Sequence, residues 1–242
     1  MTEFQEKLLN VANMNEKTNM LLSKKDAVYF ERLTRYILEA NKTHNLTAIK
    51  DDDGFILKHI VDSLALVPYI NDFDSICDIG CGGGFPSLIL DRMCRDVSIT
   101  PVDSVGKKVL SLITACYDLG ITQMRPMCAR AEEMGQKKEY RETFDTVTAR
   151  AVGRLNLICE LCLPLVKVGG RFLAKKAQST DEELKEAQNA ISLLGGQVEA
   201  VDKYTLTDGK EMLERSIIVI RKVRSTPAPY PRNNSQISKK PL

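Results

Sequence analysis

The stretch Ser75-Ile76-Cys77-Asp78-Ile79-Gly80-Cys81-Gly82-Gly83-Gly84-Phe85-Pro86 decides the fold of this 242-residue chain. It begins as a short apolar run, includes an acid near the end of that run, and then places four glycines before a proline. Glycine adopts positive φ and lets a ligand approach the backbone, and proline suits the first turn of a helix, whose N–H groups are unpaired. The stretch therefore predicts a strand, a tight loop and a helix start, as in a nucleotide-binding loop.

The spacing of these glycines distinguishes between nucleotide cofactors. A dinucleotide-binding loop has the pattern Gly-x-Gly-x-x-Gly, and here Phe85 occupies the position of its third glycine. Gly80, Gly82 and Gly84 instead form Gly-x-Gly-x-Gly, which is typical of methyltransferases that use S-adenosylmethionine (SAM). An ordinary strand-to-helix turn without a ligand is the alternative interpretation. The rest of the chain has to distinguish between the two.

Length and composition indicate a globular protein. Apolar residues make up 43% of the chain and charged residues 27%, and the length suits one α/β domain with an appended segment. The net charge of +2 neither favours nor excludes nucleic acid as a partner. The sequence has no apolar run of the ~20 residues that a membrane span needs, and its N-terminus has no secretion signal pattern. We therefore expect a cytoplasmic protein with no membrane partner.

The seven cysteines are an odd number and lie mostly in apolar stretches, which favours free buried thiols. Cys159 and Cys162 form a Cys-x-x-Cys pair, but no second pair or histidine accompanies them at the spacing of metal ligands. We therefore expect no metal.

From residue 75 onward, strand-like and helix-like segments alternate, which predicts a parallel sheet with right-handed crossovers. The expected helices include 106–118 and 154–166, and the expected strands are 75–79, 97–102, 124–128, 144–149, 170–175, 197–205 and 215–222. The last two strands are joined by a short polar connection, too short for a crossover helix, which predicts an antiparallel pair at the sheet edge. The predicted fold class is α/β and Rossmann-like: the mostly parallel, seven-stranded sheet of class I SAM methyltransferases, with an antiparallel edge strand.

Two further segments flank this predicted methyltransferase domain, which spans residues 71–223. Residues 1–70 carry apolar side chains at helical spacing and predict an N-terminal helical cap, which contains both histidines, His44 and His59. We expect each histidine to pack or hydrogen-bond, not to catalyse. Residues 224–242 contain four prolines, four basic residues and no acid, so we expect an extended basic tail with few internal hydrogen bonds; a disordered terminus is the alternative.

Ligands of an open α/β sheet bind beyond the carboxyl ends of its strands, and polar residues follow two of the expected strands there. Asp103 follows the second strand, nineteen residues after Gly84, where a carboxylate can bind both hydroxyls of a ribose. Lys107 and Lys108 stand at the start of the next helix, where they oppose the helix dipole and so favour an external anion such as phosphate. Solvated lysines are the alternative interpretation.

The third and fourth strands are followed by further charged residues. Arg130-Ala131-Glu132 follows the third strand, where an adenine can lie against the backbone. Arg150 follows the fourth, where a guanidinium can pair with the methionine carboxylate of SAM or with a substrate phosphate.

Eight motifs, in order along nearly the whole chain, resemble the RsmG (GidB) family of bacterial small-subunit rRNA methyltransferases. They are Asn45-Leu46-Thr47, 59–64, 78–86, Val102-Asp103-Ser104 with Lys107-Lys108, 130–132, 148–152, 160–165, and Tyr230-Pro231-Arg232 with Lys239-Lys240-Pro241. Two residues depart from the pattern. Ser87 stands where many members have glycine, and Pro101 stands in the second strand where the family has an apolar residue. Because proline lacks an N–H, the pairing just before Asp103 is in question.

The resemblance implies transfer of a methyl group from SAM to N7 of a guanine in the decoding-region hairpin of 16S rRNA. It places cofactor contacts at Gly80, Phe85, Ala131, Glu132 and Arg150, with Asp103 at the ribose, and the loop assignment adds Gly82. The partner would be 16S rRNA or the small ribosomal subunit, with no stable protein partner implied.

Methylation at N7 makes modest demands on the protein. N7 already carries a free lone pair, so the reaction needs positioning and no general base, and we assign no catalytic residue. N7 lies in the deep major groove of A-form RNA, so the target must be in a loop or be turned out of its stack. We expect phosphate contacts from Lys107, Lys108, Arg130, Arg150, Arg154 and Arg232. A SAM methyltransferase acting on a protein or small molecule, and a non-catalytic nucleotide-binding module of the ribosome, remain alternatives.

Overall fold

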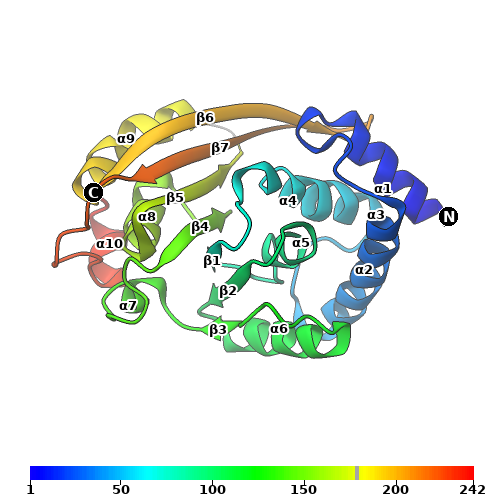
Figure 1. Ribbon diagram of the computed structural model, residues 1–242, viewed down its shortest axis with the longest axis horizontal. Coiled ribbons are helices and arrows are strands. Elements are labelled where there is room, and N and C mark those ends of the chain that lie inside the picture. Colours follow the sequence, from blue (N-terminus) through cyan, green and yellow to red (C-terminus); the bar gives the residue numbers. More distant parts are fainter. Residues whose placement is uncertain (178–179) are drawn as a thin grey trace.

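The computed structural model describes residues 1–177 and 180–242, and one seven-stranded sheet forms its centre (Figure 1). The strand order is β3-β2-β1-β4-β5-β7-β6. The strands are β1 (Ser75–Ile79), β2 (Ser98–Asp103), β3 (Met127–Cys128), β4 (Phe144–Arg150), β5 (Val166–Lys176), β6 (Gly196–Thr207) and β7 (Met212–Lys222). The order reverses direction between β1 and β4, and in open α/β sheets a ligand crevice forms beyond the carboxyl ends of the strands at such a point.

Strands β1 to β5 are parallel to one another, whereas β7 is antiparallel to both of its neighbours. The connection between β6 and β7 is only residues 208–211, where the Asp208 carboxylate accepts the N–H groups of Lys210 and Glu211 at 2.9 and 2.8 Å. A connection this short returns the chain antiparallel. The predicted fold class is confirmed, with the antiparallel pair at the edge; within that pair β7 is the reversed strand and β6 is outermost.

Helices cover both faces of the sheet. They include α5 (Ser87–Met93), α6 (Gly106–Leu119), α7 (Ala131–Met134), α8 (Leu155–Cys162), α9 (Thr180–Leu193) and α10 (Asn234–Lys239). Because successive strand residues point to opposite faces, each strand feeds two cores. Leu173 and Val219 pack with α5, α6 and the N-terminal helices, whereas Phe172 and Ile218 pack with α7 to α10.

The N-terminal segment is helical, as its periodicity predicts. It contains α1 (Glu3–Met14), η1 (Glu16–Thr18), α2 (Lys24–His44), α3 (Asp52–Phe55), the π-helical turn η2 (Ile56–Val61), α4 (Asp62–Leu64) and η3 (Val67–Tyr69). Thr2 and Ser23 begin α1 and α2 with capping boxes, which pair N–H groups that would otherwise lack partners. This cap shares one hydrophobic core with a face of the sheet. The predicted division after residue 70 falls between η3 and β1 and stays a prediction.

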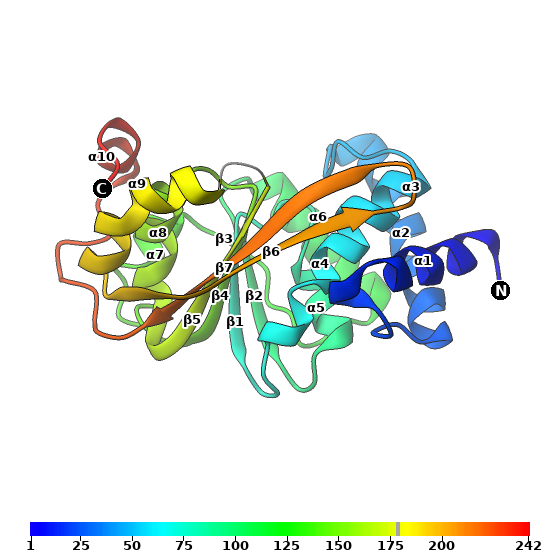
Figure 2. The same ribbon diagram turned by 90° about the horizontal axis from the view of Figure 1, so that it is seen from above.

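The long hairpin of β6 and β7 extends past the rest of the sheet and reaches the cap (Figure 2). There the buried Asn15 side chain donates to the Thr207 carbonyl and accepts the Thr207 N–H, both at 2.8 Å. Lys17 pairs with Asp202 of β6 nearby. These contacts hold the cap against the outer strands of the sheet.

Pro101 lies inside β2 without interrupting its pairing to β1, whose register is continuous. The Ile99 N–H and the Asp103 carbonyl both bond toward the β3 side, so the alternating position 101 faces that side too. The missing proline N–H therefore falls at the edge, where β3 is reduced to Met127–Cys128 and an isolated bridge at Met124. The pairing before Asp103 is intact on the β1 side, and β3 is shorter than the expected strand 124–128.

The C-terminal segment, residues 224–242, is folded onto the domain, so the expectation of an extended tail with few hydrogen bonds is wrong. Helix α10 buries Ile237 completely and is capped by the side chain of Asn233. Arg232 pairs with Glu160 of α8, whose side chain is fully buried. The segment has no acid of its own, but its partners come from other elements, which its composition alone does not reveal.

Candidate functional site

Two cavities adjoin one another at the carboxyl ends of the strands and share Gly80 and Ala151 in their walls. The larger has a volume of about 530 Å³ and the smaller about 370 Å³. All seven residues predicted to bind the cofactor line one of them. Gly80, Gly82, Phe85 and Arg150 line the larger cavity, and Gly80, Asp103, Ala131 and Glu132 line the smaller cavity. The structure therefore brings these residues together, and their cofactor contacts stay a prediction.

The carboxylate of Asp103 holds the glycine loop, residues 80–84, in place. One carboxylate oxygen accepts the Gly82 N–H at 3.0 Å and the other accepts the Val105 N–H at 2.9 Å, which ties the loop to the start of α6. Gly82 has a φ of +55° and lines the larger cavity, and a Cβ added there would meet just the Gly80 carbonyl oxygen, at 4.0 Å. A Cβ at Gly84 would instead meet side chains of Leu88 and Leu112 at 2.7 Å. Gly82 thus keeps the cavity open, and Gly84 permits packing beneath it.

Asp78, in β1, lies buried beneath this loop. Its carboxylate accepts hydrogen bonds from Ser87 Oγ at 2.7 Å and Thr148 Oγ1 at 2.9 Å. Burial raises the pKa of Asp78 to about 6, although these hydrogen bonds oppose that shift. Ser87, which departs from the family pattern, therefore supplies a donor to a buried acid.

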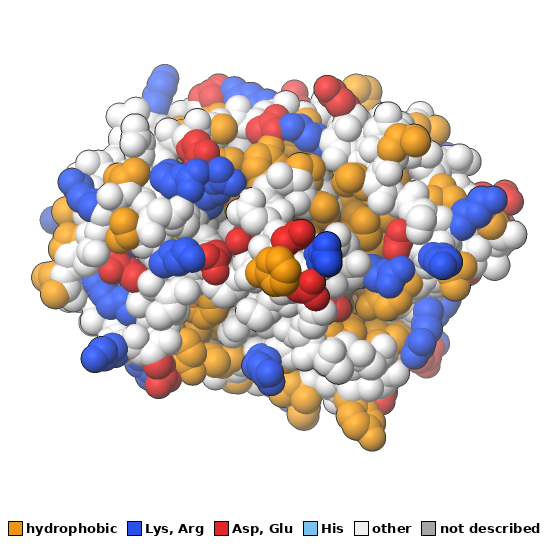
Figure 3. All heavy atoms as spheres, in the orientation of Figure 1, with side chains coloured by type: hydrophobic (Ala, Val, Ile, Leu, Met, Phe, Trp, Pro, Cys, Tyr) orange, Lys and Arg blue, Asp and Glu red, His pale blue; other side chains and the backbone are white. Residues whose placement is uncertain are grey.

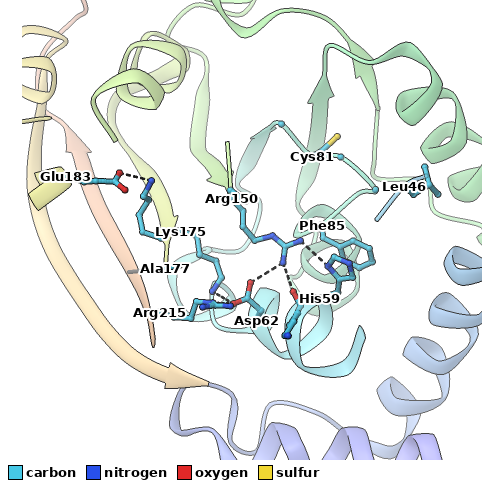
Figure 4. Close-up of a pocket in the computed structure, with 16 residues that line it drawn as sticks. Leu46, His59, Asp62, Cys81, Phe85, Arg150, Lys175, Ala177, Glu183 and Arg215 are labelled. Carbon is cyan, nitrogen blue, oxygen red and sulfur yellow. Dashed lines mark hydrogen bonds and ion pairs between the residues drawn. The ribbon is translucent and has the colours of Figure 1, made fainter. Parts of the chain in front are cut away.

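An aromatic stack forms one wall of the larger cavity (Figure 4). The rings of His59 and Phe85 stack with centroids 4.4 Å apart and an interplanar angle of 11°, and Phe55 packs edge-on against both. His59 Nδ1 lies 3.3 Å from the Arg150 guanidinium and Nε2 lies 2.7 Å from Thr47 Oγ1. Since arginine can only donate, Nδ1 accepts and Nε2–H donates to the threonine. Burial and the nearby Arg150 lower the pKa of His59 to about 3, so the ring is neutral.

Four charged side chains meet at the floor of the larger cavity (Figure 4). Asp62 Oδ1 lies 2.9 Å from Lys175 Nζ and 3.1 Å from Arg215 Nε, and its Oδ2 lies 3.0 Å from Arg150. They come from α4, β5, β7 and β4, respectively. Three cations around one carboxylate leave an excess of positive charge that faces the cavity. Burial, with Arg150 and Arg215 nearby, lowers the pKa of Lys175 to about 8 even though Asp62 opposes the shift.

Sequence reasoning identified Arg150 in this cluster but missed Lys175 and Arg215. Both lie in segments expected to be ordinary strands, and charges from distant strands give no local signal. Lys175 is the last residue of the expected strand 170–175, whereas Arg150 was identified because it directly follows the expected strand 144–149. Asp62 lies inside the family motif 59–64, just after the π-helical turn η2, a form of helix that often occurs at functional sites.

The residues predicted to contact RNA do not lie together, and they differ in whether they line a cavity or are held in an ion pair. Lys107 and Lys108 lie in the first turn of α6 and line neither cavity, whereas Arg130 lines the smaller one. Arg154 pairs with Glu186 at 2.6 Å, and Arg232 is held by Glu160. On the face drawn in Figure 3, basic side chains lie among acidic ones and form no single continuous patch. The RNA contacts of these residues stay predictions. For Arg232, the ion pair with Glu160 argues against a contact with RNA, because the guanidinium already has a partner.

The switch in strand order, the reversed strand β7 and the glycine loop after β1 define a Rossmann-like α/β fold of the methyltransferase class. Solved structures agree on the fold. A precorrin-6y C5,15-methyltransferase from Geobacter metallireducens matches 67% of this chain and 87% of its own length, with a TM-score of 0.50 and 19% identity. A branched-chain polyamine synthase from Thermus thermophilus matches 69% of this chain and 57% of its own length, with a TM-score of 0.55 and 10% identity.

The chain belongs to the GidB family, described as rRNA small subunit methyltransferase G, whose model matches residues 26–215. A ribosomal RNA small subunit methyltransferase G from Geobacillus sp. (strain WCH70) is 44% identical over 95% of this chain and 96% of its own length. One from Caldicellulosiruptor bescii is 45% identical over 85% of this chain and 88% of its own. Within residues 1–177 and 180–242, no helix is long and apolar enough to cross a membrane, and no three His, Cys, Asp or Glu residues are grouped as metal ligands.

Proposed function

We propose that this protein transfers a methyl group from SAM to N7 of a guanine in the decoding-region hairpin of 16S rRNA. The observation that carries the proposal is the junction of two cavities at Gly80 and Ala151. One cavity has acids suited to a nucleoside, and the other has excess positive charge suited to a polyanionic acceptor. Membership of a family named for rRNA methylation supports RNA as the acceptor. Such a target would place the protein in the cytoplasm.

The residues of the two cavities fit SAM. In the smaller cavity, Asp103 would accept hydrogen bonds from the ribose hydroxyls, and Ala131 and Glu132 would border the adenine. In the larger cavity, Arg150 would pair with the methionine carboxylate, and the open space at Gly82 leaves room for the chain between the two ends. When bound, SAM supplies a methyl group on a positively charged sulfur, which is open to attack by a lone pair.

The guanine brings its own nucleophile, so the protein's task is placement. The N7 lone pair would form the new C–N bond as the C–S bond of SAM broke, and the positive charge would pass from sulfur to the purine, so the protein would not have to move a proton. The stacked rings of Phe85 and His59 suit the face of a base turned into the larger cavity, and Arg215, the most exposed of the three cations, suits a phosphate beside it. Methyl transfer to N7 by this arrangement would need no catalytic acid or base.

The proposal is tested by incubating the protein with methyl-labelled SAM and small ribosomal subunits from cells that lack the enzyme. Digestion of the RNA to nucleosides should recover the label as 7-methylguanosine, at one position in the decoding-region hairpin. Asp103→Ala should abolish labelling, because it removes the carboxylate that holds Gly82 and faces the ribose. Label in another nucleoside would contradict the proposal, and label in protein would favour the alternative acceptor class.

A further inference from the structure

The C-terminal segment forms part of the wall of the smaller cavity. Asn234, the first residue of α10, lines this cavity together with Asp103, Glu132 and Leu161. Helix α10 contacts α8, the helix that carries Leu161, and lies beside it in Figure 1. The N-terminal cap of α10 is made by the neighbouring Asn233, so the amide of Asn234 is not needed to pair the helix N–H groups. A side chain with one donor and one acceptor end therefore stands at the rim of the proposed nucleoside site.

A buried ion pair fixes the chain just before Asn234. The Glu160 carboxylate accepts three hydrogen bonds from Arg232: from the backbone N–H at 2.9 Å, from Nε at 2.8 Å and from the terminal nitrogen at 2.6 Å. Glu160 has no exposed surface, and a buried carboxylate without a partner is strongly unfavourable. The position of residue 232 is thus set by α8, which itself borders the cavity.

The preceding residues are fastened to the same part of the domain. The Arg141 guanidinium donates to the carbonyls of Thr226 and Tyr230, each at 2.7 Å, and Gln136 donates to the Pro231 carbonyl at 2.7 Å. Pro231 also packs so closely on Gly135 that a Cβ at that glycine would lie 2.7 Å from the proline ring. Gly135 directly follows α7, whose first residues line the smaller cavity. The segment is therefore fastened both to α8 and to the end of α7, two helices that border the cavity.

We propose that Asn234 recognises the base of the bound adenine nucleoside and that the Glu160–Arg232 pair is the device that positions it. An adenine edge presents an N–H donor beside a ring-nitrogen acceptor, and an asparagine amide matches both at once. This inference rests on the proposed function, because the nucleoside is taken to be that of SAM. It makes the C-terminal segment part of the cofactor site.

The first test measures binding by calorimetry with two probes, S-adenosylhomocysteine and 5′-methylthioadenosine, which share the adenosine and differ in the amino-acid end. Asn234→Ala should weaken both by about three- to tenfold, the loss expected for one or two hydrogen bonds. Ser238→Ala, an exposed residue of the same helix that lines neither cavity, is the matched control and should bind normally.

Unchanged binding of both probes to Asn234→Ala would overturn the inference while leaving the proposed function intact. Weakening of S-adenosylhomocysteine alone would overturn the assignment to the base. If the unaltered protein bound neither probe, the proposed cofactor itself would be wrong, and this inference would fall with it. Failure of the proposed role of Asn234 can thus be distinguished from failure of the proposed function.

The second test separates positioning from simple stabilisation. Glu160→Gln keeps the shape of the side chain but removes its charge, and it should lower both the melting temperature and the affinity for 5′-methylthioadenosine. Because Glu160 acts through Asn234, the double variant Glu160→Gln/Asn234→Ala should bind no more weakly than Asn234→Ala alone. Affinities are measured well below the melting temperature, with circular dichroism to verify folding. Additive losses in the double variant would overturn the positioning role.

Discussion

Single residues of the site serve different physical purposes even when they are of the same type. Gly82 and Gly84 both have positive φ, but the first lines the larger cavity with room for a Cβ, whereas the second is enclosed by Leu88 and Leu112. A substitution at the first should change what the cavity holds, whereas one at the second should change how the loop packs. The pair therefore offers a matched comparison of binding with stability.

We predict that Gly82→Ala lowers the affinity for S-adenosylhomocysteine about tenfold and costs about 1–2 kcal/mol of stability, the strain of a left-handed alanine. Gly84→Ala should cost about 3 kcal/mol or more, because overpacking adds to the same strain. Calorimetry and chemical denaturation measure the two effects. Equal stability losses, or normal binding by Gly82→Ala, would contradict the assignment of the two glycines.

His59 makes folding sensitive to acid. Its pKa is about 3 in the folded protein against 6.5 for an unfolded chain, so between these values only the unfolded chain binds the extra proton. The contribution of His59 to the free energy of unfolding is fully present above pH 6.5. Below pH 6.5, it falls by about 1.4 kcal/mol for each pH unit until the pH approaches the pKa of the folded protein. Asp78, whose pKa rises from 3.8 to about 6, acts in the opposite direction between those values.

We predict that the stability of His59→Gln falls less on acidification than that of the unaltered protein. The substitution removes the titration of His59, which destabilises the protein in acid, and leaves that of Asp78, which acts in the opposite direction. Between pH 6.5 and 5, the loss of stability in the unaltered protein should exceed that in His59→Gln by about 2 kcal/mol. Urea denaturation at a series of pH values measures this. Parallel curves for the two proteins would show that His59 is not held neutral. His44→Gln, at the exposed histidine, is the control.

At the scale of elements, the site depends on helices and strands that each contribute one or two charges. The cap supplies Asp62, and β4, β5 and β7 supply Arg150, Lys175 and Arg215. The carboxylate is the only negative partner of the three cations within this cluster as described. Removing it should therefore cost more than removing any one cation.

We predict that Asp62→Asn destabilises the protein by about 3–5 kcal/mol, because it leaves buried cations uncompensated. Lys175→Met should cost less than half as much, since Asp62 keeps two arginine partners and the methionine fills a similar volume. Differential scanning calorimetry of both variants gives the comparison. A larger loss in Lys175→Met would mean that the lysine, not the aspartate, holds the cluster together.

For the whole molecule, the cap and the sheet behave as one packed body. They share a hydrophobic core, and the far end of the β6–β7 hairpin is fastened to the cap by Asn15 (Figure 2). The Asn15 side chain satisfies both backbone groups of Thr207, and an unsatisfied polar group that is kept from water is costly. The cap should accordingly unfold together with the sheet.

We predict one cooperative unfolding transition. Asn15→Ala should lower the free energy of unfolding by about 2–3 kcal/mol, because it leaves the N–H and the carbonyl of Thr207 without this partner. The exposed Asn13, two positions away, accepts the Met20 N–H and has no other side-chain hydrogen bond within residues 1–177 and 180–242, so Asn13→Ala should cost about 1 kcal/mol or less. Far-ultraviolet circular dichroism and tyrosine fluorescence should give coincident transitions. A separate early transition for the helices would show that the cap folds independently.

The sequence by itself determined the glycine loop, the mostly parallel sheet, the antiparallel hairpin at its edge and the charged residues that follow several strands. These features are local, because a strand, the loop after it and the next helix are each determined by residues that are adjacent in the sequence. The charge cluster of Asp62, Lys175 and Arg215 and the packed C-terminal segment were decided only by the tertiary structure. Each depends on partners far apart in the chain, 153 residues for Arg215 with Asp62 and 72 for Arg232 with Glu160, and only the folded sheet brings those partners within hydrogen-bonding distance.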